Sequence, residues 1–429
     1  MATTTLSQLR QKLMEEIAGR DGYRQGTTTG AGSSTTAADT VLADKPDDYY
    51  SLYYLLLTSG TYSGSIRPLS DFTQTGGVMT WLAALAGASG TAVTYELCLF
   101  HPSDVLRALN EASFEGYPYV KRRIRDVNLL ISGNWLNDGG FEDWTSATAL
   151  REWAAVGTAT FSKTTTIYAS RLWGKTAAAV TSVAANDGIK QSTTNNAALA
   201  DLRGNSVTFR AQVAGSSGDV VIRITDDDGT TSSSALTGAA TWELLEVTRT
   251  ISSTTKVITF DIISPGNNSF YVDNARVIGP AIYKYKLPFF VVDVAELSLQ
   301  SNANETWMCD DVDEAYPFSQ ISTYDYVYNN TDRILYIPRL LPDERKIKII
   351  GGGYLSTLSA DTDTVELDGD ELRPYIALAA HKLYQSQAGL AAASEDKTRF
   401  RQEAAEWYQE YEKRRMTHSR PQPVRIPYY

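Results

Sequence analysis

Histidine is the side chain best suited to proton transfer near neutral pH, and this chain of 429 residues has three, His101, His381 and His418. His101 lies in an HP dipeptide at a predicted helix start, His381 in a predicted core helix, and His418 near the C-terminus. None belongs to a G-x-S-x-G, H-E-x-x-H or comparable frame. We therefore expect no catalytic residues and no enzymatic activity.

Acidic side chains are the second group that could do chemistry. The segment CDDVDEAY places four carboxylates in five positions, Asp310, Asp311, Asp313 and Glu314. Carboxylate oxygens are suited to a hard cation, but a run of like charges is also typical of a solvated, self-repelling loop. Both interpretations stay open for this segment.

Composition restricts the class of protein. The length predicts two to four domains, and 43% hydrophobic with 21% charged residues is typical of a folded protein. A net charge of −11 argues against a protein that coats nucleic acid. No apolar stretch has the length needed to span a bilayer, and the two cysteines, Cys98 and Cys309, are too few for a disulfide framework. These features indicate a protein from a reducing cytosol that does not insert into a membrane.

The first 130 residues predict a helix, a small antiparallel β domain and a second helix. Leu6, Leu9 and Leu13 lie on one helical stripe, and Thr5 with Gln8 has the spacing of a capping box. Short apolar runs separated by SG, TGG and ASG turns follow. HPSDVLRALNEASF then predicts a helix with Ser103 as its N-cap, continuing as a helical region to about Asn128.

The central segment, residues 131–280, has a different texture. Its strands VTFRAQV, VVIRITD, LLEVTRT and VITFDII are joined by Gly/Ser/Asn/Thr turns, including an Asp-Gly hairpin signal in DDDGTTSSS. This pattern predicts an inserted β-sandwich.

After Pro280, strands such as KIKIIGGGYL and a pair of helices are predicted, with GGGY as a turn at a strand end. One helix carries Leu372, Ile376, Ala379 and Leu383, and the other, starting near Ser394, places Phe400, Ala404, Trp407 and Tyr411 on one face. The expected fold class is multidomain α+β. Its domains are a body of residues 1–130 and 281–416, the sandwich of 131–280, and an extended tail of 417–429.

The two ends of the central segment resemble the first and last strands of jelly-roll carbohydrate-binding modules. The resemblance rests on NDGGFEDW, on NSFYVDNARV and on the internal RLWGKTAAAV. In that family the corresponding acids commonly contribute to a structural calcium site, which implies Glu142 and Asp273 here. Two carboxylates on adjacent strands also repel each other unless a cation or hydrogen-bond donors lie between them.

Sugar recognition by such a module needs aromatic rings exposed on a sheet face or loop. The candidates are Trp144, Trp153, Trp173 and Trp242, and the alternative is that these rings are buried in the core.

The flanking segments resemble head-to-tail adaptor (connector or neck) proteins of tailed bacteriophages. The resemblance rests on DDYYSLYYLLLTSGTYSGSIRPLSDFTQTGG, YELCLFHPSDVLRALNEA, LRPYIALAAHKLYQSQAG and RFRQEAAEWYQEYEKRR. It implies a ring, typically a dodecamer, at the head–tail junction of a virion assembled in the bacterial cytoplasm. The ring contacts the portal on one rim and tail or neck proteins on the other, and DNA passes through it without specific binding. No cofactor is required for this role, and the structural Ca²⁺ that the module resemblance implies is an additional, non-essential expectation.

The basic, aromatic tail fits this interpretation, because it is suited to lie along a neighbouring subunit or the portal. Its predicted anchors are Arg420, Arg425, Tyr428 and Tyr429. Two other classes stay open: a glycan-binding adhesin or glycan-active enzyme, and another tail structural protein such as a terminator or baseplate component. A glycosidase would need two carboxylates flanking a cleft.

Overall fold

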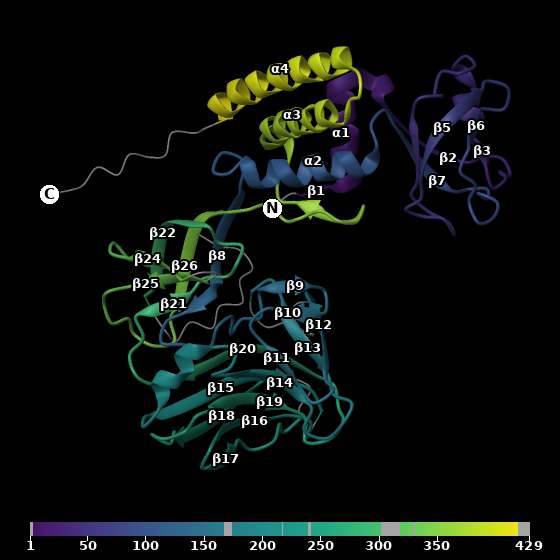
Figure 1. Cartoon of the computed structure of the whole chain (residues 1–429). Coiled ribbons are helices and arrows are strands. Elements are labelled where there is room, and N and C mark those ends of the chain that lie inside the picture. The colour runs from purple at the N-terminus through teal and green to yellow at the C-terminus, as the bar shows by residue number, and fades with distance from the viewer. Residues whose placement is uncertain are drawn as a thin grey trace. The chain divides into compact units, whose positions relative to one another are not determined.

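The protein divides into two compact units, which a computed structural model defines (Figure 1). The structure describes residues 3–166, 174–216, 218–238, 242–301, 318–329 and 332–418. Unit 1 comprises Met1–Arg122 and Tyr354–Tyr429, and unit 2 comprises Arg123–Gly353. The protein is therefore mixed α and β, mostly β, with a pair of helices near the C-terminus.

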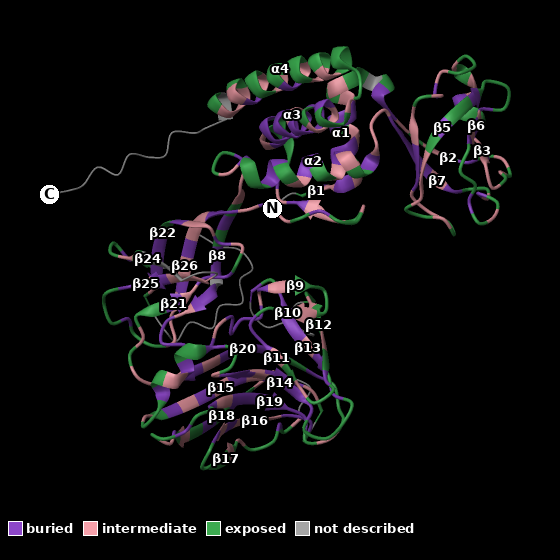
Figure 2. Ribbon diagram, in the orientation of Figure 1, coloured by how far each residue is buried: buried purple, intermediate pink, exposed green. Residues whose placement is uncertain are grey.

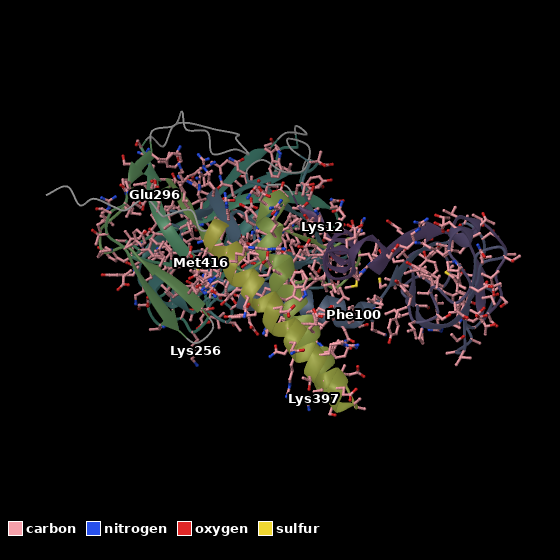
Figure 3. The ribbon with its side chains drawn as sticks, turned by 90° about the horizontal axis from the view of Figure 1, so that it is seen from above. Lys12, Phe100, Lys256, Glu296, Lys397 and Met416 are labelled. Atoms are coloured by element: carbon pink, nitrogen blue, oxygen red, sulfur yellow. The ribbon has the colours of Figure 1, made fainter. Side chains whose placement is uncertain are left out.

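Unit 1 contains a helical layer with its own core. Its helices are α1 (Leu6–Ala18), α2 (Pro102–Glu115), α3 (Leu372–Leu390) and α4 (Ser394–His418). Buried leucines of α1 and α2 pack with Tyr375 and Leu383 of α3 and with Tyr411 of α4. Seen from above, α4 is the long helix whose two ends are marked by Lys397 and Met416 (Figure 3). Two segments that are far apart in the sequence thus share one core.

The helix caps show one prediction confirmed and one wrong. Thr5 and Gln8 form the predicted capping box of α1. The predicted N-cap of α2, Ser103, lies inside the helix, and His101 caps it by accepting a hydrogen bond from the Ser103 N–H at 3.2 Å. Pro102 fits the first helical position, where no intrahelical donor is needed, so the helix begins two residues earlier than predicted.

Unit 1 also contains a small β domain. Its six-stranded antiparallel sheet has the order β2-β7-β4-β5-β6-β3, and the strands are Tyr23–Thr27, Thr94–Cys98, Tyr54–Leu57, Ile66–Thr73, Val78–Trp81 and Thr36–Ala38. Trp81, Phe72 and Tyr95 are among its buried side chains. In addition, β1 (Thr4–Thr5) pairs with β27 (Thr364–Val365), so the two segments of unit 1 are joined by a strand pair as well as by the helical core.

The region after α2 differs from the prediction of a helix to about Asn128. Helix α2 ends at Glu115 with Gly116 as its C-cap, and residues Arg122–Ile131 form strand β8. Ile124, Leu129 and Leu130 of RRIRDVNLLI are buried in a β core, and the segment pairs in a sheet instead of continuing the helix. Strand β8 is the edge of a four-stranded sheet, β23-β22-β26-β8, with β23 Phe318–Gln320, β22 Asp293–Gln300 and β26 Lys346–Gly353.

That sheet packs into the second core of unit 2 with a smaller sheet, β21-β25-β24 (Lys284–Lys286, Asp332–Tyr336 and Asp325–Asn329). Residues 281–353, assigned from the sequence to the same body as the terminal helices, therefore lie in unit 2. Their partner in the core is β8, which precedes the sandwich. We call β8 and β21–β26 the flanking sheets.

The glycines of GGGY lie within β26 and not in a turn as predicted. A Cβ at Gly353 would lie 1.8 Å from the Phe290 carbonyl oxygen, and one at Gly351 would lie 2.1 Å from that of Asp293. Glycine is needed here because the neighbouring backbone approaches closely, which is a role of glycine inside strands.

The inserted segment is a sandwich of two five-stranded antiparallel sheets. Sheet F has the order β11-β14-β19-β16-β17, with strands Ala154–Val156, Gly188–Ser192, Thr259–Ile263, Val221–Asp226 and Gly229–Ser232. Sheet G has the order β12-β13-β20-β15-β18, with strands Thr160–Thr164, Ala177–Thr181, Phe270–Ile278, Ser206–Ala214 and Glu243–Thr250. A hairpin, β9 (Trp144–Ser146) and β10 (Ala149–Leu150), precedes them.

Inward side chains of both sheets form the largest core of unit 2, and buried residues alternate with exposed ones along the strands (Figure 2). Aligned packing of two such sheets is typical of jelly-roll sandwiches. The predicted Asp-Gly hairpin is the turn between β16 and β17, where Asp226 pairs with Gly229. The start and end of the sandwich are hydrogen-bonded to each other, since the Trp135 N–H donates to the Val277 carbonyl at 3.0 Å.

Candidate functional site

The outward face of sheet G carries two aromatic residues. Leu245 and Val247 of β18 point into the core, so alternation directs Leu244 outward, and Trp242, two residues earlier, lies on the same face. Leu244 is 43% exposed and Trp242 is partly exposed. On β20, Phe270 and Val272 point inward, and Tyr271 between them is 37% exposed.

Strand register aligns these aromatic residues in one row. Tyr271 is opposite Ala214 of β15 and opposite Ala179 of β13. The pairing of Val213 with Glu243, continued by one residue, places Trp242 opposite Ala214. Since neighbouring strands lie about 4.8 Å apart, Trp242 and Tyr271 are separated by about 10 Å across the sheet. Ala214 lies between the two rings and leaves the space between them low, and Ala179 lies beyond Tyr271. We call Trp242, Ala214, Tyr271 and Ala179 the aromatic row.

Polar groups flank the aromatic row. Gln212 lies between Leu244 and Asp273 in the adjacent row and is partly exposed. Farther along the same face, Glu344 of the loop before β26 accepts from Arg210 at 2.6 Å and pairs with Arg276 at 3.1 Å. The far end of the face is therefore covered by the flanking sheets, whereas Leu244 and Tyr271 at the other end are exposed, although Asp273 beside them is buried.

The other predicted glycan contacts differ from Trp242. Trp153 is 3% exposed, stacks on Phe141 and donates to the Asp138 carbonyl at 3.0 Å, so it is a core residue and that prediction is wrong for it. Trp144 is half-buried against the same core and donates to the Phe141 carbonyl. Trp173 lies outside the described residues.

The predicted calcium ligands lie in a cluster of acids. Burial raises the pKa of the Glu142 carboxyl well above its usual value, and the charges of Asp126, Asp138 and Asp273 raise it further. Hydrogen bonds from the backbone N–H groups of Lys175 and Thr176 oppose this shift. Asp273 is fully buried, and its Oδ1 accepts from the Asn274 N–H at 2.7 Å.

The fit of a metal to this cluster is mixed. Carboxylates gathered in a buried place favour a cation, whereas the Thr176 hydroxyl and two backbone N–H groups already donate to Glu142. Among the described residues, no group of three or more His, Cys, Asp or Glu side chains is arranged to hold a metal ion. Calcium at Glu142 and Asp273 stays a prediction.

The remaining predictions concern the acid run, the C-terminal tail, His381 and membrane-spanning helices. The acid run Asp310, Asp311, Asp313 and Glu314 and the tail anchors Arg420, Arg425, Tyr428 and Tyr429 lie outside the described residues. His381 makes a 2.7 Å hydrogen bond with the Ala404 carbonyl between α3 and α4, which is a structural role. Within the described part of the chain, no helix has the length and apolarity to cross a membrane.

Sequence reasoning missed Tyr271 and Gln212. Alternation in SFYVD, with Phe270 and Val272 as core residues, could have placed Tyr271 on the outward face. No local signal could have shown that it aligns with Trp242, because the two residues are brought together by strand order.

Comparison with solved structures finds carbohydrate-binding jelly-roll domains and a phage tailspike domain. The CBM22-1 xylan-binding domain of Paenibacillus barcinonensis Xyn10C is 16% identical, with 37% of this chain and 96% of that chain covered at a TM-score of 0.26. TmCBM61, solved with β-1,4-galactotriose, is 15% identical, with 34% and 99% covered at a TM-score of 0.25. The enzymatically active domain of bacteriophage CBA120 tailspike protein 4 is 11% identical, with 34% and 22% covered at a TM-score of 0.26. No family model and no curated protein matches the chain.

Proposed function

We propose that this protein binds glycans through the exposed end of sheet G and that it does so without catalysis. The observation that carries the proposal is the aromatic row, in which Trp242 and Tyr271 lie on one outward face with only alanine between them. A pyranose ring has an apolar face of C–H groups and a rim of hydroxyls. Flat aromatic side chains bind the apolar face, and amides such as that of Gln212 exchange hydrogen bonds with the rim.

The spacing of the row favours an extended chain over a single sugar. Rings about 10 Å apart contact two separate sugar units of one polymer, and Ala214 between them lets the chain lie flat on the sheet. Each contact is weak because the face is shallow and wet. Affinity would increase if several copies of the module bound one glycan surface.

The proposal is tested with Trp242→Ala and Tyr271→Ala in the full chain. Xylan and β-1,4-galactan, the polymers related to the ligands of the structural neighbours, are suitable first probes together with bacterial surface polysaccharides. For a polymer that binds, we expect each variant to weaken retention in affinity electrophoresis at least tenfold, which corresponds to about 1.4 kcal/mol.

The matched control is Tyr283→Ala, which removes a tyrosine of comparable exposure, 41%, outside the row. Retention by the control should equal that of the unmodified protein. If all three variants bound a retained polymer equally, the aromatic row would not be the glycan site.

A second candidate function is that of the phage head–tail adaptor, favoured by one specific observation. The first and last segments of the chain fold into one unit around a shared helical core, which is what an assembly body interrupted by an insertion requires. In this proposal unit 1 forms a ring between the portal and tail proteins of a virion. The resemblance to adaptor proteins implies a dodecamer, and the copy number is the quantity to measure. Genome DNA passes through its lumen, and the tail anchors contact the portal or a neighbouring subunit.

Native mass spectrometry of the purified chain, alone and mixed with the portal protein of the same phage, tests this second function. A ring that forms on or with the portal supports it. A chain that stays monomeric in both samples contradicts it, whatever the result with glycans.

A further inference from the structure

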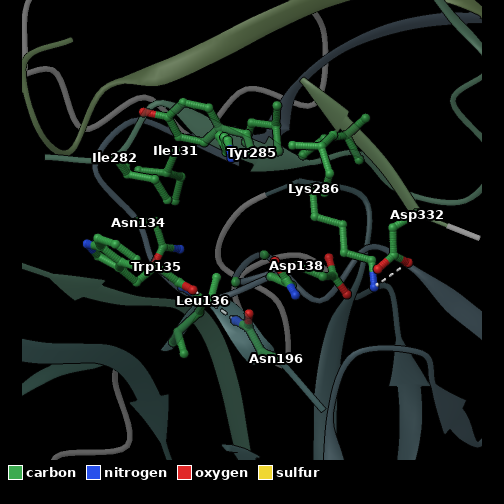
Figure 4. A pocket seen from close by; sticks show the side chains of 18 of the residues that line it. Ile131, Asn134, Trp135, Leu136, Asp138, Asn196, Ile282, Tyr285, Lys286 and Asp332 are labelled. Carbon is green, nitrogen blue, oxygen red and sulfur yellow. Dashed lines mark hydrogen bonds and ion pairs between the residues drawn. The ribbon is translucent and has the colours of Figure 1, made fainter. Parts of the chain in front are cut away.

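Unit 2 contains a second candidate site, a pocket of about 430 Å³ between the sandwich and the flanking sheets (Figure 4). The loop before the sandwich, residues 134–140, forms one side with residues 195–198, and β8, β21 and β25 form the other. Its volume is in the range of pockets that enclose small ligands. The aromatic row is not part of its lining.

One wall of the pocket is apolar. Ile131, Ile282 and the Tyr285 ring lie along it in Figure 4. The Tyr285 hydroxyl is directed to the Gly133 N–H, from which it accepts at 3.3 Å, so the ring presents carbon atoms to the pocket. Trp135 is also in the lining, and its indole N–H donates to the Pro280 carbonyl at 3.0 Å.

The other end is polar and already holds a paired ammonium group. Lys286 Nζ lies 2.9 Å from a carboxylate oxygen of Glu152 and 3.1 Å from one of Asp332. Glu152 is buried, whereas the Asp332 side chain is 42% exposed. Two carboxylates thus surround one ammonium, and this end of the pocket has a local excess of negative charge.

Two amides in the lining have oxygen atoms left to accept hydrogen bonds. Asn196 is 5% exposed and uses its Nδ2 to donate to the Trp135 carbonyl and to Gln191. Asn137 uses its Nδ2 to donate to Glu152 at 3.3 Å. Within the described part of the chain neither side-chain oxygen accepts a hydrogen bond. A ligand that supplies O–H groups could therefore donate a hydrogen bond to each of the two amide oxygens.

We infer that this pocket binds one neutral saccharide unit, with an apolar sugar face against Ile282 and Tyr285 and hydroxyls on Asn137, Asn196 and Asp332. The inference does not rest on the aromatic row, because the pocket is lined by other residues and encloses a free sugar. An apolar wall beside open acceptors matches a pyranose, which has an apolar face of C–H groups and a rim of hydroxyls.

The charge distribution sets the class of sugar. A phosphate or carboxylate on the ligand would be repelled by Asp332 in the lining and by the nearby Glu152, and the Lys286 ammonium that could offset this repulsion is already paired with both. Lys284, the other cation of the lining, is exposed, so solvent screens its charge. A neutral sugar donates to the same oxygens without that repulsion. The pocket should therefore discriminate against acidic sugars.

The test uses the full chain and a panel of D-glucose, D-galactose, N-acetyl-D-glucosamine and glucose 6-phosphate, each titrated by protein-observed NMR or calorimetry. We expect saturable binding of at least one neutral sugar and at least tenfold weaker binding of glucose 6-phosphate than of glucose. Asp332→Asn, which keeps the shape of the side chain, should reduce this discrimination.

Ala198→Trp provides the blocking variant, because Ala198 is exposed and lines the pocket. Ala200→Trp, on the same 3₁₀ turn (Ala197–Leu202) but outside the lining, is the matched control. Loss of sugar binding in Ala198→Trp and its retention in Ala200→Trp and Trp242→Ala is the expected result. The inference is overturned if no neutral sugar binds, if Ala198→Trp binds as well as its control, or if glucose 6-phosphate binds more tightly than glucose.

Discussion

Single carboxylates organise the loops of the sandwich, and Asp226 shows how. It is buried at the end of β16 and accepts from the Arg249 guanidinium, from the Ser252 N–H at 3.0 Å and from the Asp228 N–H at 3.1 Å. The Arg249 hydrogen bond is the main reason that the pKa of Asp226 lies below its usual value. One side chain thereby ties the β16–β17 hairpin to the end of β18.

The lowered pKa gives Asp226→Asn a defined pH dependence. A carboxyl whose folded pKa is depressed contributes stability above its unfolded pKa, and the contribution is lost as pH falls through the folded value. At pH 7 we expect the variant to lower the free energy of unfolding of the sandwich by about 1.5 kcal/mol, the lower end for hydrogen bonds to a charged group. Denaturant melts at several pH values measure it.

The difference between the two proteins should begin to shrink below about pH 4, where the carboxyl of the unfolded chain becomes protonated, and should be lost as pH falls through the lower folded pKa. Asp228→Asn, an exposed acid in the same hairpin, is the control and should change stability little. A difference for Asp226→Asn that stays constant from pH 7 to pH 3 would contradict the electrostatic explanation.

At the scale of elements, the loop before β9 and strand β20 bring Glu142 near Asp273, together with Asp126 of β8 and Asp138. Calcium bound there would stabilise the folded state by mass action, by about 2.7 kcal/mol at a concentration one hundred times its Kd. We therefore predict that millimolar CaCl₂ raises the melting temperature of chelator-treated protein by several degrees. Differential scanning fluorimetry measures this shift.

Glu142→Gln should abolish the calcium-dependent shift, because it removes one carboxylate ligand. Without calcium it should raise the melting temperature, since it removes a buried acid that neighbouring acids repel. MgCl₂ serves as the ionic control. Equal effects of CaCl₂ and MgCl₂, or a full calcium-dependent shift of the melting temperature in Glu142→Gln, would show that Glu142 is not a ligand of a specific calcium site.

The strand order of the sandwich also decides which aromatic residues can act together. Trp242 and Tyr271 are 29 positions apart by their numbering, and only the placement of β15 between β18 and β20 aligns them. Trp153, which is closer in sequence to the NDGGFEDW motif, is buried in the core of the sandwich. Tryptophan in a jelly-roll sequence is thus an incomplete predictor of a sugar contact.

At the scale of the whole molecule, the division into two units predicts separate unfolding. Unit 2 has the cores of the sandwich and of the flanking sheets within residues 123–353, and the chain returns to unit 1 through a short segment at each boundary. We expect a fragment of residues 123–353 to fold alone. Calorimetry of the full chain should then show two transitions, one of which matches that of the fragment.

A fragment of residues 133–280 is the informative comparison, because it lacks β8 and the flanking sheets. It should be less stable than 123–353, since Arg210 and Arg276 lose their partner Glu344. If 123–353 were unfolded while the full chain melted in one transition, the two-unit description would not hold in solution.

Local patterns in the sequence predicted much of the fold and part of the site. The capping box at Thr5 and Gln8 and the hairpin at Asp226 depend on residues a few positions apart, so their chemistry can be recognised in the sequence. The strand at Arg122–Ile131 was mistaken for helix because a basic, aromatic run is compatible with both periods until the core it faces is known.

By itself, the sequence determined that a β-sandwich with hydrogen-bonding turns interrupts a chain with helices near its ends, because alternation and turn residues act locally. Tertiary structure decided that residues 281–353 join the sandwich in unit 2, that Trp153 is buried, and that Tyr271 aligns with Trp242. It also decided that residues on both sides of the insertion enclose a pocket. Strand order and shared cores join residues far apart in the chain, and no local pattern encodes which distant partner a buried strand will choose.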